Sequence, residues 1–89
     1  MIIVQNYING KFQSTDKNID DINPATGEII ASIPKSNSNE VQMAVDAADK
    51  ARKPWSELSL EERTQWLDKI ADSLESRSEQ VASLESLDT

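Results

Sequence analysis

The chain contains only two glycines, Gly10 and Gly27, and each stands in a turn signal between short apolar runs. In the pair Asn9-Gly10, both residues accept the positive φ that a tight hairpin turn requires. Pro24 presets φ at the start of the second turn, and Gly27 can take the left-handed conformation that closes it. The first third of the chain is therefore predicted to form two β-hairpins between residues 4 and 34.

The strands of the second hairpin are predicted at residues 19–23 and 28–34. Three isoleucines at positions 29, 30 and 33 supply the β-branched side chains that strands favour. Pro34 ends the second strand, because proline has no N–H to donate to a ladder.

From residue 36 onward the apolar residues follow a helical period. Four of them fall at i, i+3, i+4 and i+7, namely Val41, Ala44, Val45 and Ala48. Asn37 and Glu40 have the spacing of a capping box, with Asn in place of the usual Ser or Thr. Pro54 restricts Lys53 to extended conformations and so should end the helix. We expect a helix over about residues 38–53.

A second helical region is predicted over about residues 59–88. Ser59 and Glu62 form a full capping box at its start. Its apolar face is made by Trp66, Leu67, Ile70, Ala71 and Leu74. Ser76 and Glu79 repeat the capping spacing, so we expect a break near residues 76–78 and a third short helix. The fold class is α+β, with N-terminal β-hairpins followed by two or three α-helices.

Composition excludes several classes of function. The 89 residues include no Cys and no His, which removes disulfides, a cysteine nucleophile and the commonest general base. The net charge is −7, of which −6 falls in residues 54–89, so a nucleic-acid partner is not expected. This acidic surface is either solvated or faces a basic partner. No run is long enough for a membrane helix, and the initial MIIV lacks the basic region of a signal peptide.

Candidate catalytic residues are few. Asp20 and Asp21 are adjacent on a predicted strand, so their side chains should point to opposite faces. Glu61 and Glu62 fall in a first helical turn, where acids favour the helix dipole. Trp55 and Trp66 could stack on a ligand or pack between the hairpins and the helices. Neither a P-loop nor a dinucleotide fingerprint is present. The residues alone describe a small acidic α+β segment without catalytic apparatus.

Six sequence pieces nevertheless occur in a particular order. They are residues 7–12 (YINGKF), 22–28 (INPATGE), 44–48 (AVDAA), 54–55 (PW), 62–63 with 70–72 (ER and IAD), and 84–89 (LESLDT). In this order and at this spacing, they resemble the N-terminal segment of the NAD(P)-dependent aldehyde dehydrogenase superfamily. The resemblance covers essentially the whole chain from about residue 6, although N-P-x-T-G-E alone specifies only a turn.

The resemblance implies an oxidoreductase that converts an aldehyde to a carboxylic acid with NAD or NADP. In the family, a cysteine thiolate attacks the aldehyde, the thiohemiacetal passes a hydride to the cofactor, and a glutamate activates the water that hydrolyses the thioester. These residues lie later in the family sequence, so no catalytic or cofactor-binding residue is assigned here and residues 1–89 alone should be inactive. The segment would be part of the α/β cofactor-binding domain of a cytoplasmic homo-oligomer, without nucleic-acid or membrane partners.

One family site can be placed on this sequence by resemblance. Many members hold a structural monovalent cation through backbone carbonyls just before the N-P pair and an aspartate near the end of this segment. The matching positions are Asp21, Ile22 and Asp88. Neutral carbonyls with one carboxylate suit a weakly held K⁺ or Na⁺. The alternative is that Asp88 only caps the following turn.

Two readings of the whole chain remain open. In the first, it is the N-terminal part of an aldehyde dehydrogenase, whose family chain normally continues directly after the position of Thr89. The segments NPATGEII and ESLDT are similar to the corresponding sequences of semialdehyde and betaine-aldehyde dehydrogenases. In the second, it is an independent acidic interaction module without enzymatic activity.

Overall fold

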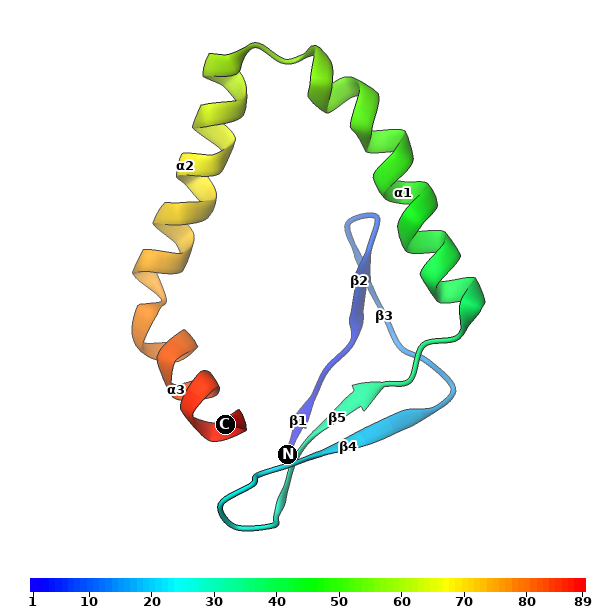
Figure 1. Cartoon of the computed structure of the whole chain (residues 1–89), viewed down its shortest axis with the longest axis vertical. Coiled ribbons are helices and arrows are strands. Elements are labelled where there is room, and N and C mark those ends of the chain that lie inside the picture. The colour runs from blue at the N-terminus through cyan, green and yellow to red at the C-terminus, as the bar shows by residue number, and fades with distance from the viewer.

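A computed structural model describes all 89 residues, which form five short strands followed by three helices (Figure 1). The elements are β1 (Ile2–Ile3), β2 (Asn6–Ile8), β3 (Lys11–Gln13), β4 (Asn18–Ile22), β5 (Ile29–Pro34), α1 (Ser38–Glu57), α2 (Leu60–Ser76) and α3 (Ser78–Asp88). The predicted α+β class, with hairpins before helices, is confirmed. No helix combines the length and the apolar character that crossing a bilayer requires.

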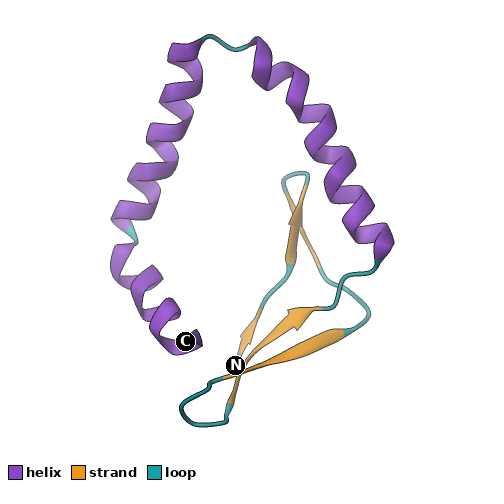
Figure 2. Ribbon diagram, viewed as in Figure 1, coloured by secondary structure: helices purple, strands orange, loops and turns teal.

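The strands form two separate sheets beneath an arch of helices, with α1 on one flank and α2 and α3 on the other (Figure 2). β2 and β3 make a two-stranded antiparallel ribbon, in which Tyr7 lies opposite Phe12 with ring centroids 5.0 Å apart. β4 and β5 make the second predicted hairpin. β1 adds to it by pairing parallel to β5, with Ile2 opposite Ala31. This parallel pairing was not predicted, because a two-residue strand carries no alternating pattern.

Both predicted turns form as their residues require. Asn9 and Gly10 have φ of 52° and 77°, as expected for a tight hairpin turn. In the second turn, Gly27 has a φ of 75° and its N–H donates to the carbonyl of Asn23 at 2.8 Å. The side-chain oxygen of Asn23 also accepts from the N–H of Ala25 at 2.9 Å, which fixes the entry to the turn.

The two predicted capping boxes are present. The Asn37 side chain accepts from the N–H of Glu40 at 3.1 Å, and the Glu40 carboxylate accepts from the N–H of Asn37 in return. Ser59 and Glu62 make the same reciprocal pair at 3.1 and 3.2 Å. These side chains satisfy N–H groups that the first turn of a helix leaves without backbone partners.

The predicted end of α1 at residue 53 is wrong, because the helix continues to Glu57 with Pro54 inside it. Proline costs a helix one hydrogen bond, here to the carbonyl of Lys50. Lys50 is exposed, so water can hydrate that carbonyl, and only one turn follows the proline. The hydroxyl of Ser56 also donates to the carbonyl of Lys53 at 2.8 Å, which stabilises this last turn.

The predicted break after residue 76 is confirmed, but its capping residue is not. Arg77, with φ −116° and ψ 20°, separates α2 from α3 and provides no side-chain cap. The hydroxyl of Ser76 donates backwards to the carbonyl of Ser73 at 2.9 Å, so it ends α2 instead of starting α3. Back-bonding of this kind competes with capping for the same hydroxyl.

The chain buries very little of itself. Only Ile8 and Ala31 are buried, at 8% and 5% exposure. The radius of gyration is 16.7 Å, whereas a compact domain of this length has about 12 Å. The accessible surface of 7462 Å² is roughly 2,200 Å² larger than the surface expected for a folded monomer of this mass. The apolar faces of the elements therefore lack partners within residues 1–89.

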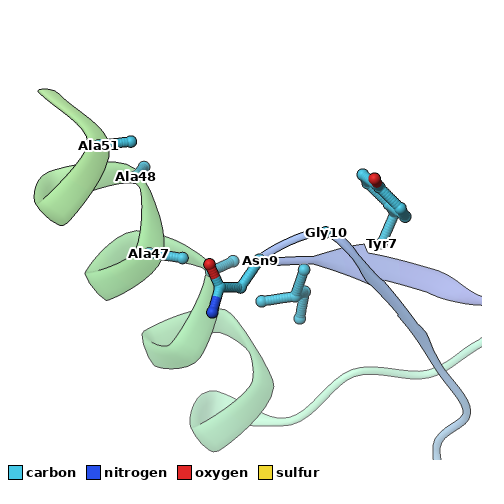
Figure 3. A pocket seen from close by; sticks show the side chains of 8 residues that line it. Tyr7, Asn9, Gly10, Ala47, Ala48 and Ala51 are labelled. Atoms are coloured by element: carbon cyan, nitrogen blue, oxygen red, sulfur yellow. The ribbon is translucent and has the colours of Figure 1, made fainter. Parts of the chain in front are cut away.

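One place where strands and helices meet is the turn of the β2–β3 ribbon against α1. Asn9 and Gly10 face Ala47, and the ring of Tyr7 points away from the helix (Figure 3). Ile8 is buried beside this contact. The small side chains of α1 leave a hollow of about 290 Å³ between the ribbon and the helix.

Candidate functional site

The predicted cation site begins at the end of β4. Asp21 pairs with Ala31 of β5 and Ile22 pairs with Ile29, so Ile30 is an extra residue on β5. Such a bulge twists the strand and changes the direction of neighbouring side chains. Asp21 is half-buried here, while the adjacent Asp20 is exposed, in agreement with their predicted positions on opposite faces of the strand.

Asp88 reaches the same place from the other end of the chain. It is the last residue of α3, and the helical arm brings this end back to the N-terminal strands (Figure 1). The last carbonyl groups of a helix have no intrahelical donors, and the end carries a partial negative charge. The last turn of α3 has no basic residue. Acidic side chains and free carbonyls therefore gather at this end of α3.

The side chains of Asp21 and Asp88 are neighbours in the hollow between the three-stranded sheet and α3. This contact with the Asp88 carboxyl raises the pKa of Asp21, and partial desolvation and repulsion by the Asp88 charge act in the same direction. A hydrogen bond from the backbone of Ile22 lowers the pKa of Asp21 but does not offset the other effects. The pair thus favours either a shared proton or a bound cation.

The pair lies at the edge of an open hollow of about 380 Å³ between the three-stranded sheet and α3. Its walls are mostly apolar and consist of Ile2, Val4, Asp21, Ile30, Ala31, Val81, Leu84, Glu85, Leu87 and Asp88. Glu85 was not predicted as part of this region. Its spacing of three residues before Asp88 places both on one face of a helix, and that spacing was the available signal.

The three predicted ligand positions are therefore brought together. Ile22 directly follows Asp21 at the end of β4, and Asp88 meets Asp21 by its side chain. Two carboxylates beside backbone carbonyls are the hard oxygen donors that an alkali or alkaline-earth cation prefers. No group of three His, Cys, Asp or Glu side chains is close enough to hold a metal ion. Any cation at this place would therefore have to take its remaining ligands from backbone carbonyl oxygens.

The remaining candidates show no convergent site. Glu62 is engaged in the capping box, and the adjacent Glu61 is exposed in the same first turn. Trp55 and Trp66 do not pack between the hairpins and the helices, because they are 41% and 52% exposed. The ammonium group of Lys69 lies 4.5 Å from the ring centroid of Trp66.

The family profile and individual relatives that match this sequence indicate one kind of enzyme, the aldehyde dehydrogenases. The profile of the aldehyde dehydrogenase family matches residues 11–89. The chain is 45% identical over 87 residues to a (Z)-2-((N-methylformamido)methylene)-5-hydroxybutyrolactone dehydrogenase of Acinetobacter baylyi, with 96% of this chain covered. It is 41% identical over 87 residues to the 2-aminomuconic semialdehyde dehydrogenase of Danio rerio, with 98% covered. It is 36% identical over 89 residues to the 2-hydroxymuconic semialdehyde dehydrogenase of a Pseudomonas species, with 97% covered. The chain spans 18% of the length of each of these relatives.

Proposed function

Since the chain belongs to the aldehyde dehydrogenase family, we propose that it is the N-terminal scaffold of an oxidoreductase that converts an aldehyde to a carboxylic acid with NAD(P)⁺. In such a reaction, water would supply the second oxygen of the acid, and a bound NAD(P)⁺ would accept the hydride. The 89 residues include no Cys, so the thiolate that attacks the aldehyde in this family has to come from outside them. Residues 1–89 alone are therefore inactive.

The observation that carries this proposal is the unfinished core. Nearly all large apolar side chains of the helices are exposed, and only two residues of the whole chain are buried. An excess of roughly 2,200 Å² of surface is of the size that obligate interfaces bury. The relatives extend to more than five times the matched length, which provides enough chain to cover these faces.

We place residues 1–89 in the cofactor-binding domain of the full-length enzyme. The strands and helices of this segment support that domain from outside, since none of their side chains forms a phosphate-binding loop or a nucleophile with a base. The choice between NAD and NADP depends on residues beyond this segment.

A structural K⁺ or Na⁺ at Asp21, Ile22 and Asp88 is the second part of the proposal. The cation would lie between β4 and the end of α3, held by the two carboxylates and by backbone carbonyls. It would neutralise the repulsion that the carboxylate pair creates at neutral pH. Its role is to connect β4 with the end of α3, without participation in the chemistry.

A semialdehyde is the proposed class of substrate, supported by the similarity of the chain to two muconic semialdehyde dehydrogenases. We further propose a cytoplasmic homo-oligomer, with the rest of the dehydrogenase chain as the main partner of residues 1–89. No side chain described above selects among individual aldehydes.

The test is an activity assay of the full-length polypeptide that carries residues 1–89. We expect formation of NAD(P)H that depends on aldehyde, with a higher kcat/KM for a carboxylated semialdehyde than for an alkyl aldehyde of equal length. A matched variant with the family's catalytic cysteine replaced by alanine controls for contaminating activity. A full-length polypeptide that oxidises no aldehyde with either cofactor would contradict the proposal.

A further inference from the structure

One face of α2 carries an apolar stripe that nothing in residues 1–89 covers. Leu67, Ile70 and Leu74 occur at i, i+3 and i+7, and each is 57–58% exposed. Arg63 precedes Leu67 by four residues and therefore lies on the same face, at the N-terminal end of the stripe. Arg63 is thus the single charged residue at the N-terminal end of an otherwise apolar surface.

Arg63 differs from the rest of α2 in its burial. It is half-buried, whereas every other residue of the helix is exposed. Its Nε atom has no contact with solvent and no hydrogen-bond partner. An arginine usually buries its aliphatic stem and leaves the guanidinium in water. Buried donors are nearly always paired in finished structures, so this Nε–H is a donor whose acceptor is not among residues 1–89.

The neighbouring acids do not supply that acceptor. Glu62 accepts from the N–H of Ser59 at 3.2 Å as part of the capping box. Glu61 precedes Arg63 by two residues and so points to a different side of the helix. The one ion pair of the chain joins Arg52 and Asp49 at 3.4 Å, in α1. A chain with 16 acidic residues therefore leaves this arginine without a partner.

We propose that Arg63 anchors a carboxylate on the part of the polypeptide outside residues 1–89 that covers the apolar stripe of α2. The Nε–H and one Nη–H group of a guanidinium form a planar pair of donors that matches the two oxygens of a carboxylate. The inference rests on the proposed function, because the occupant of the stripe is the rest of the dehydrogenase chain. The length of the relatives and the excess surface both favour this occupant over solvent.

The arrangement has the form of a specific docking surface. Apolar side chains supply most of the contact area, and one buried charge pair fixes the position of the covering surface along α2. A covering surface displaced by one helical turn would leave the guanidinium unpaired in an apolar environment, which is strongly unfavourable.

The test compares arginine variants in the full-length polypeptide. Arg63→Lys keeps the positive charge but loses Nε–H and the planar pair of donors, and Arg63→Met keeps only the length of the stem. We expect amide hydrogen exchange in α2 to accelerate at least about tenfold in Arg63→Lys and more in Arg63→Met. Arg52→Lys is the matched control, since it changes an exposed, surface-paired arginine, and its exchange in α2 should stay within about twofold of the wild type.

A crystal structure of the wild-type full-length polypeptide decides the identity of the partner, even where a variant fails to fold. We expect one carboxylate from beyond residue 89 of the same chain within hydrogen-bond distance of Nε and an Nη of Arg63. A guanidinium paired with a carbonyl, with solvent or with a second copy of the chain would overturn the inference. If the full-length enzyme oxidises aldehydes while Arg63→Lys behaves like Arg52→Lys, only this inference fails. If no longer polypeptide carries residues 1–89, the proposed function fails together with it.

Discussion

Truncation of Ile70 to alanine tests whether the apolar stripe of α2, which is exposed in residues 1–89, is covered in the full-length polypeptide. In residues 1–89 the side chain is 57% exposed, so less than half of its surface is already protected. Burial of a whole isoleucine side chain stabilises a protein by about 1.5–3 kcal/mol, and removal of a buried one costs about 2–5 kcal/mol once the cavity is included. We therefore expect Ile70→Ala to cost about 2–3 kcal/mol in the full-length polypeptide, and about 0.5 kcal/mol or less in the 89-residue chain.

Native-state hydrogen exchange of the α2 amides measures this difference in both proteins. A loss of about 2–3 kcal/mol corresponds to exchange that is roughly 30- to 150-fold faster in the full-length variant. Asp72→Ala is the matched control, because Asp72 is exposed and lies on the opposite side of α2 from the apolar stripe. The reasoning is refuted if Ile70→Ala accelerates exchange by the same small factor in both proteins, or if Asp72→Ala has the larger effect.

Three other substitutions test local features. Gly27→Ala should lower stability by about 1–2 kcal/mol in a urea titration, because its φ of 75° is strained for an L side chain while a Cβ atom meets nothing within 4 Å. Ser59→Ala should cost α2 about 0.5–2 kcal/mol by circular dichroism, with Ser59→Asp close to the wild type. The raised pKa of Asp21 means that its contact with Asp88 stabilises the fold below the ordinary aspartate pKa and loses this contribution as the pH rises through the raised value. An NMR titration should show that Asp88→Ala returns the pKa of Asp21 towards its ordinary range; an unchanged pKa would exclude Asp88 as the cause.

The fold was predictable wherever short-range chemistry decides the backbone. The turns at Gly10 and Gly27 and the caps at Asn37 and Ser59 follow from residue type and spacing, and all are present. Pro54 was misjudged, because the rule that proline ends a helix does not account for a last turn in which the freed carbonyl can reach water. The parallel pairing of β1 with β5 joins segments far apart in sequence, and two residues carry too little pattern to predict it.

The candidate site was likewise predicted only in part. The positions of Asp21, Ile22 and Asp88 came from a family resemblance, since nothing in the sequence indicates that Asp21 and Asp88, which are 67 positions apart, lie close together. The structure adds the contact between the two carboxylates and the apolar hollow beside them. Arg63 could not be identified from sequence, because its unpaired Nε is a property of side-chain packing. The sequence indicated only that Arg63 precedes Leu67 by four residues and so lies on the same face of α2.

We propose that residues 1–89 are one part of a longer dehydrogenase chain. The most direct measurement is the intact mass of the cellular polypeptide whose peptides map to residues 1–89. Since 87 residues make up 18% of the Acinetobacter relative, that relative is about 480 residues long, and we expect a polypeptide of similar length. A cellular polypeptide of 89 residues that folds cooperatively as a monomer would contradict the claim and support an independent interaction module.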